Sequence, residues 1–335
     1  MSMEETRTQS REDTAKLRGD LHSVKSPVLV TGAPGTGKTS LLIDTAVAHL
    51  DTGLDPQSLL IIGPTRLAAA SIRDELSRRA ERTFTEPVVR TWSAYAFDLI
   101  RRARVERLLP QLERVPRLLS GPEQDTLIGH LLEGHAAGLT EGPPWPSELA
   151  LAVETRGFRK EIREFFDRVS ELGLEPADIA DLGQKANRPE WHAAALFYQE
   201  YRDLLDLGSA EAFDPAGLIT RAAEILEDNE AFLHAEQDRL ALILVDDLQE
   251  ATLSQHRLLA LLGKDRALVA FAAPDSVVQG FRGARTDELH RFAQNYASTG
   301  EATSLELTHG YRMSGPITEA WQRIVSRIPL AAGLS

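Results

Sequence analysis

The residues with the clearest chemical potential form one glycine-rich segment, Gly32-Ala33-Pro34-Gly35-Thr36-Gly37-Lys38-Thr39-Ser40. The segment satisfies the pattern G-x-x-x-x-G-K-[ST] in full. In this pattern, successive backbone N–H groups surround the α- and β-phosphates of a nucleotide, and the glycines allow the phosphates to approach closely. Lys38 is then expected to reach the β- and γ-phosphates, and the Thr39 hydroxyl to ligate Mg²⁺. The sequence therefore predicts a nucleotide site.

A second pair of chemical groups, Asp246 and Asp247, follows the apolar run at 240–245. In an open parallel sheet, ligands bind at the carboxyl ends of the strands. Two carboxylates at such an end could hold Mg²⁺ and position or activate a water molecule. Taken alone, the pair could equally form a turn or cap a helix over residues 252–262. Because the phosphate-binding pattern is also present, we favour the role in Mg²⁺ and water chemistry.

These residues must be positioned by an alternation of strands and helices. A short apolar run at 27–30 enters the glycine-rich segment, and apolar residues from Leu41 to Leu50 lie on one side of the helix expected after it. Gly53 and Pro56 end that helix before a second apolar run at 59–62. Further runs of strand length at 240–245 and 267–271 suit a parallel sheet covered on both faces. The predicted fold class is α/β.

The middle of the chain has a different pattern. From about residue 98 to 207 the apolar residues recur at helical spacing, and we find no strand signal there. One example is Phe158, Ile162, Phe166 and Val169. We therefore predict an all-α insertion that divides one α/β domain into two halves distant in the sequence.

Composition excludes several classes of protein. The chain has 335 residues, enough for roughly two domains at about 150 residues each. It contains no cysteine, which excludes disulfides, thiolate zinc sites and cysteine nucleophiles. No apolar run reaches the roughly 18 to 20 residues that span a bilayer, and residues 1–20 lack the apolar region of a signal peptide. We expect a cytoplasmic protein with no membrane partner.

Charge is distributed unevenly. The net charge of -13 is opposite to that of a typical nucleic-acid-binding protein. Between Arg66 and Arg117, however, twelve arginines oppose seven acidic residues, a local charge of +5. The simpler explanation is amphipathic helices with a solvated face, since Ile72, Leu76 and Ala80 recur at spacings of four. From charge alone, we favour that explanation over a nucleic-acid site.

Six motifs taken together resemble superfamily I DNA helicases of the UvrD/Rep type, in both identity and order. They extend from about residue 28 to 314. A finer likeness is to the AdnA or AdnB motor subunits of the AdnAB helicase–nuclease, carried by residues 273–279 and the acidic composition. The motifs are Gly32 to Thr39, Gly63 to Ala69, Arg90 to Ala96, Val245 to Glu250, Pro274-Asp275 with Gly280 to Ala284, and Tyr311 to Ser314.

The resemblance implies a role for each matching position. ATP and Mg²⁺ would be the cofactors, with residues 32–40 around the phosphates and Thr39 and Asp246 on the metal. Asp247 would stand where the family has its catalytic glutamate, and Gln249 would couple phosphate to DNA. Arg282 and Arg312 match the motif arginines, and Arg312 would be an arginine finger at the γ-phosphate. The expected single-stranded DNA contacts are Thr65, Arg66, Thr91, Trp92 and Phe281.

Several positions depart from the family pattern. Asp247 is one methylene shorter than the family's glutamate, so hydrolysis could be slow. Ser276 replaces a glutamine near the γ-phosphate, and Gln279 replaces a tyrosine. Leu17 stands near the place of a glutamine that recognises adenine. Trp92, considered alone, could equally be an ordinary core aromatic.

We therefore expect a RecA-like P-loop domain of residues 18–98 and 211–304, interrupted by a helical insertion at 99–210. Residues 1–17 would be a flexible N-terminus, and residues 305–335 would begin a second, truncated motor domain. The expected function is the motor portion of an ATP-dependent DNA helicase, acting on single-stranded DNA or DNA ends in repair or recombination. Its partner would be a second component of a helicase–nuclease. Two alternatives stay open: a DNA-binding scaffold with a degenerate nucleotide site, and a P-loop kinase or regulatory ATPase unrelated to DNA.

Overall fold

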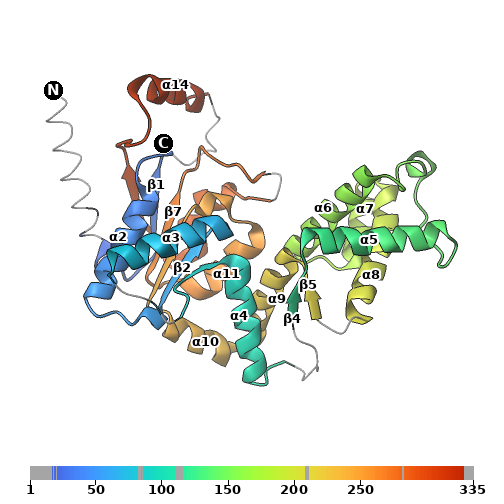
Figure 1. Ribbon diagram of the computed structural model, residues 1–335, viewed down its shortest axis with the longest axis horizontal. Helices are drawn as coiled ribbons and strands as arrows, with labels where there is room; N and C mark the ends of the chain where they lie inside the picture. Colours follow the sequence, from blue (N-terminus) through green and yellow to red (C-terminus); the bar gives the residue numbers. More distant parts are fainter. Residues whose placement is uncertain are drawn as a thin grey trace. The chain divides into compact units, whose positions relative to one another are not determined.

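The chain divides into two compact units. The computed structural model describes residues 17, 19, 21–81, 84, 86–109, 116–207, 211–280 and 283–327. The first unit comprises residues up to Tyr95 and from Leu226 onward, and the second comprises Ala96–Ile225. Figure 1 shows both units and labels many of their elements. The domain boundaries expected from the sequence remain predictions. One of these boundaries, at residue 304, falls inside a strand, Thr303–Leu307.

The first unit contains a six-stranded sheet in which every neighbouring pair of strands is parallel. The strand order is β3-β2-β6-β7-β1-β8, so strands from the two ends of the sequence are interleaved in one sheet. The predicted parallel sheet is confirmed. Its strands are β1 (Val28–Gly32), β2 (Leu59–Gly63), β3 (Val89–Thr91), β6 (Leu242–Val245), β7 (Leu268–Ala272) and β8 (Thr303–Leu307).

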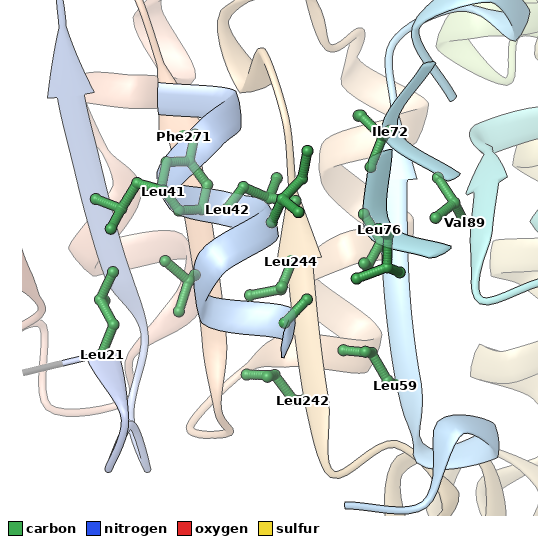
Figure 2. Packing of buried hydrophobic residues seen from close by; sticks show 14 of the residues in the cluster. Leu21, Leu41, Leu42, Leu59, Ile72, Leu76, Val89, Leu242, Leu244 and Phe271 are labelled. Carbon is green, nitrogen blue, oxygen red and sulfur yellow. The ribbon is translucent and has the colours of Figure 1, made fainter. Parts of the chain in front are cut away.

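Helices cover both faces of this sheet. Successive strand residues point to opposite faces, and all the residues of β2, β6 and β7 are buried. Figure 2 shows one face, where Leu41 and Leu42 of α2 and Ile72 of α3 pack over the strands. The helices of the first unit are α2 (Lys38–Asp51), α3 (Arg66–Arg79), α10 (Glu230–Arg239), α11 (Leu253–Gly263), α12 (Asp287–His290) and α13 (Phe292–Tyr296), with short 3-10 helices η1 (Pro56–Ser58) and η3 (Leu248–Glu250). A further helix, α14 (Gly315–Val325), buries none of its residues.

The register of the sheet brings five strand ends to one edge. Thr31 pairs with Ala272 and Ile62 with Val245, so β1, β7, β6 and β2 end at nearly the same level. Gly63 pairs with Thr91, which adds the end of β3. Because the strands are parallel, the loops that leave these ends all lie on the same edge of the sheet. The phosphate loop and the aspartate pair therefore have a common location.

The second unit is mainly helical, and its core follows the apolar spacing seen in the sequence. Phe158, Ile162, Phe166 and Val169 of one helix are buried in a single cluster. Its helices are α5 (Gly121–Ala136), α6 (Arg156–Leu172), α7 (Pro176–Lys185) and α8 (Pro189–Leu207), with η2 (Ser147–Leu149). Two further helices, α4 (Trp92–Val105) and α9 (Pro215–Asp228), each begin or end in the first unit.

One detail of this region differs from the sequence prediction. The expectation of no strand between residues 98 and 207 is wrong at β4 (Pro116–Leu118), which pairs in parallel with β5 (Glu211–Phe213). A three-residue strand is too short to show a period of two, and its partner lies far along the chain. In the part of the chain that the structure describes, no helix combines the length and the apolar character needed to cross a membrane.

Candidate active site

The phosphate loop connects β1 to α2 and has a shape that only glycine adopts freely. Gly35 and Gly37 have φ angles of 86° and 87°, in the left-handed region that side chains other than glycine rarely enter. A Cβ atom on Gly35 would also lie 2.8 Å from the Cβ of Arg312. The Thr36 hydroxyl donates to the carbonyl of Ala33 at 2.8 Å and stabilises the turn. The glycines in this pattern therefore have a steric purpose.

Lys38 begins α2 and turns back over the loop. Its Nζ donates to the carbonyl oxygens of Gly32 at 2.7 Å and Ala33 at 3.0 Å. The residue is 8% exposed. Burial lowers the pKa of its amino group, an effect opposed by the nearby Asp247 and Asp246 carboxylates. A phosphate oxygen would be a stronger partner for this ammonium than the two neutral carbonyls are.

Thr39 and Asp246 meet although 207 positions separate them. The Thr39 hydroxyl donates to Oδ2 of Asp246 at 2.9 Å. Asp246 is 4% exposed, and its other oxygen, Oδ1, is buried without a hydrogen-bond partner. Burial raises the pKa of Asp246 to about 6, and repulsion from Asp247 adds to the rise. A hydroxyl beside an unpartnered carboxylate oxygen fits Mg²⁺, which prefers hard oxygen ligands and few carboxylates.

Asp247 adopts an unusual backbone conformation at the end of β6. Its φ and ψ are 50° and 48°, a left-handed conformation that aspartate tolerates better than most residues do. Its Oδ1 accepts a hydrogen bond from Nε2 of Gln249 at 3.0 Å. The buried Gln249 amide is itself fixed, because its Oε1 accepts from the backbone N–H of Ala273 at 2.9 Å. The Asp247 carboxylate is thus oriented by a contact that reaches across to the end of β7.

A cavity of about 330 Å³ is lined by Lys38, Thr39, Asp247 and Gln249 but not by the buried Asp246. Arg312 reaches it because the backbone N–H of Tyr311 donates to the carbonyl of Gly35 at 2.9 Å, which fixes residues 311 and 312 at the phosphate loop. Two cationic side chains, those of Lys38 and Arg312, therefore line the cavity and suit an anionic ligand. The lining residues are Pro34, Gly35, Gly37, Lys38, Thr39, Ser40, Asp247, Gln249, Glu250, Ala273, Ser276, Val278 and Arg312.

Four of the five residues expected to contact DNA, namely Thr65, Arg66, Thr91 and Trp92, lie at or just after the ends of β2 and β3 on the same sheet edge. Thr65 caps α3 by accepting from the N–H of Ala68 at 3.1 Å, and Thr91 accepts from the N–H of Ala94 at 3.3 Å. Arg66 is exposed. Trp92, in contrast, is 6% exposed, so its ring would have to move before a base could stack on it. The Thr65 and Thr91 hydroxyls already accept hydrogen bonds from nearby backbone N–H groups.

Two of the predicted residues, Phe281 and Arg282, lie outside the described part of the chain. Among the residues that line the cavity but received no role from the sequence is Glu250, which follows Gln249 directly. Its position beside the aspartate pair was the available signal. The fold gives Glu250 hydrogen-bond partners nearly thirty positions away, which no local pattern indicates.

Comparison with known proteins decides the family. The model of the UvrD/REP helicase N-terminal domain family matches residues 14–297, most of the chain. The chain belongs to this family. The resemblance seen in the ordered motifs is therefore confirmed at the family level, and the first unit is an α/β domain of the RecA-like type.

Individual relatives are distant. The chain is 23% identical over 312 residues to the ATP-dependent DNA helicase Rep of Escherichia coli (strain K12), covering 91% of this chain and 42% of that protein. It is 22% identical over 320 residues to Rep of Salmonella typhimurium, covering 93% and 43%. One component of an ATP-dependent helicase/nuclease of Heliobacterium modesticaldum is 29% identical over 83 residues, 25% of this chain and 6% of that protein. The chain spans about two-fifths of the length of its Rep relatives.

Proposed function

We propose that this chain is the nucleotide-binding motor portion of an ATP-dependent DNA helicase or translocase. The observation that carries the proposal is the contact between Thr39 and Asp246, with the second Asp246 oxygen left unpartnered beside Lys38. A protein without a ligand here would gain nothing from a buried carboxylate oxygen that lacks a hydrogen bond. Family membership supports DNA as the second ligand.

Each residue at the cavity has a chemical task in this proposal. Lys38 and Arg312 would bind phosphate oxygens, and Arg312 would stabilise the charge that develops on the transferred group. Thr39 and Asp246 would hold Mg²⁺, which supplies neutralisation of the phosphate charge when bound. Asp247 would accept a proton from the attacking water, held in orientation by Gln249. Gln249 also contacts the end of β7, which suits a role in linking phosphate to the rest of the domain.

The DNA path would follow the ends of β2 and β3, where the exposed Arg66 could contact phosphate. Roles for Thr65, Thr91, Trp92, Phe281 and Arg282 belong to the same proposal. An assembly with a helicase–nuclease partner, as in AdnAB, is the finer proposal. The partial likeness to the Heliobacterium helicase/nuclease supports it.

The first test concerns Lys38. We expect Lys38→Ala to weaken binding of a fluorescent ATP analogue by about 100-fold, because hydrogen bonds from a charged donor are worth about 1.5 to 3 kcal/mol each. Lys25→Ala is the matched control, since Lys25 is exposed and does not line the cavity. Equal affinity in both variants would refute the assignment of the phosphate loop.

The alternative function is a DNA-binding scaffold with a degenerate nucleotide site. It is motivated by Asp247 and Ser276, which stand where the family has a glutamate and a glutamine. Stimulation of ATP hydrolysis by single-stranded DNA separates the two functions, because a scaffold with a degenerate site would bind DNA without hydrolysing ATP faster. Hydrolysis that DNA does not change would instead favour a P-loop enzyme unrelated to DNA.

A further inference from the structure

The segment formed by residues 274–280 is part of the cavity wall. It leaves the end of β7, and Ser276 and Val278 line the cavity. It has no regular secondary structure over most of its length. The side chain of Val278 is 73% exposed, so burial of apolar surface does little to hold this part of the segment in place. Its position must depend on hydrogen bonds.

Those hydrogen bonds come from Glu250. One oxygen of its carboxylate accepts from the backbone N–H of Val278 at 2.8 Å, and the other accepts from that of Gln279 at 2.7 Å. The carbonyl of the next residue, Ala251, accepts from the backbone N–H of Arg285 at 2.9 Å. Residues 250 and 251 therefore bind the chain on both sides of the stretch 280–284.

The neighbouring Gln249 holds the start of the same segment through the N–H of Ala273. Two consecutive side chains, Gln249 and Glu250, thus fix both ends of the segment. They lie within the short helix η3, and only Leu248 separates them from the Asp246–Asp247 pair. The candidate metal ligand, the candidate base and the cavity wall are consequently connected through five consecutive residues.

The charge on Glu250 also has to be accounted for. A carboxylate that lines a cavity for phosphates would repel them unless hydrogen-bond donors on other groups stabilised its negative charge. Here each oxygen accepts a backbone N–H, and such charge-assisted bonds are about twice as strong as neutral ones. With both oxygens engaged in this way, Glu250 is poorly placed to serve as a substitute base for the glutamate that the family has at position 247.

We propose that Glu250 is a positioning residue that holds residues 274–280 against the nucleotide cavity. It acts through the backbone of Val278 and Gln279 and takes no proton from the attacking water. The proposal rests on the proposed function, since it assigns the cavity to ATP. It adds a residue and a role that the motif resemblance does not supply.

Hydrogen exchange provides the direct test. Peptides covering residues 274–280 would be followed by mass spectrometry in the wild type, in Glu250→Gln and in Asp265→Asn. An amide can offer only one oxygen to the two N–H groups, so we expect exchange at Val278 and Gln279 to be about tenfold faster in Glu250→Gln. Unchanged exchange would overturn the proposal.

Asp265→Asn is a matched control. The Asp265 carboxylate likewise accepts from a backbone N–H of a distant segment, that of Ser298 at 2.7 Å, and it does not line the cavity. Exchange should change at Ser298 and stay the same at 274–280. If Glu250→Gln does not fold, Glu250→Asp takes its place, because its shorter carboxylate reaches the two N–H groups less well. Faster exchange in Glu250→Asp supports the role, and wild-type exchange overturns it.

Affinity for a fluorescent ATP analogue separates positioning from mere stability. We expect binding to weaken about threefold to tenfold in Glu250→Gln, since up to one charge-assisted hydrogen bond to the segment is lost, and to stay at the wild-type value in Asp265→Asn. Faster exchange with wild-type affinity would overturn the proposal, because the segment would then not shape the cavity. Absence of binding in the wild type would instead refute the proposed function, whatever the exchange data show.

Discussion

Asp246 and Asp214 are two buried carboxylates that behave alike in one respect and differ in another. Asp246 lies in the first unit and is 4% exposed, and Asp214 lies in the second unit and is 6% exposed. Burial raises the pKa of each to about 6. Judged by pKa alone, each would be an equally good candidate for a functional site.

Their hydrogen bonds separate them. Both oxygens of Asp214 have partners, since Oδ1 accepts from the N–H of Gly217 at 2.7 Å and Oδ2 from the Ser170 hydroxyl at 2.8 Å. The first of these contacts caps the start of α9. Asp246, in contrast, has one oxygen without a partner and faces a second carboxylate and a lysine. The comparison teaches that an elevated pKa reports burial, whereas an unpartnered oxygen beside other charged groups indicates a ligand.

The largest expected effect tests whether the site around Asp246 is active. We expect Asp247→Asn to slow single-turnover ATP hydrolysis by about 10² to 10⁴-fold, because neutralising a general base typically costs that much. Binding of ATP should persist, since Lys38 and the loop are unchanged. The measurement uses the full-length protein with single-stranded DNA, and any partner's own ATP site is disabled.

Asp214→Asn is the control for this experiment, because it neutralises a buried carboxylate that does not line the cavity. Wild-type hydrolysis in Asp247→Asn would show that the first site is degenerate. The scaffold function would then be favoured. The difference between Asp246 and Asp214 would concern their hydrogen bonds alone and not ATP hydrolysis.

A smaller effect, on ATP affinity, is expected when the candidate Mg²⁺ ligand Asp246 is changed. Asp246→Asn should weaken the Mg²⁺-dependent part of ATP affinity about tenfold, which corresponds to about 1.4 kcal/mol from one lost charge contact. Titrations with Mg²⁺ and with EDTA measure that part directly. Asp214→Asn should keep the full Mg²⁺ dependence. Equal Mg²⁺ dependence in the two variants would remove the distinction that the unpartnered oxygen suggests.

The last prediction concerns stability and pH in the second unit. Because the pKa of Asp214 is about 6 in the folded state and 3.8 in the unfolded reference, the folded state binds its proton more tightly. The contribution of Asp214 to stability therefore falls as pH rises from about 4 to about 6, by about 2 to 3 kcal/mol. Denaturant unfolding at several pH values, wild type against Asp214→Asn, isolates this contribution. A difference that does not vary with pH would contradict the assigned cause.

Much of the first unit could be predicted because its signals are local. The apolar run before Gly32 and the glycines that follow specify a strand, a turn and a helix within about 25 residues. The apolar run at 240–245, which Asp246 follows, also indicated a strand. The helical spacing around Phe158 and Phe166 likewise indicated the core of the second unit, where both residues are buried.

Other features escaped prediction because their signals are short or distant. β3 and β4 have three residues each, too few to show alternation. β8 contains exposed residues at a sheet edge, so it lacks the apolar run of a central strand. The sequence left Trp92 open between a DNA contact and a core residue, and it is buried in the structure.

The phosphate loop, the parallel α/β class and the family could be read from the amino-acid sequence, since each depends on residues that are neighbours in the chain or on motifs in a fixed order. The groups that meet across long sequence separations become visible in the folded chain alone. Thr39 contacts Asp246 because β1 and β6 lie on either side of β7 with their ends level, and Glu250 contacts Val278 because β6 and β7 are adjacent. Strand order and register fix these contacts, and they arise from packing across the whole sheet, which no local spacing of residues records.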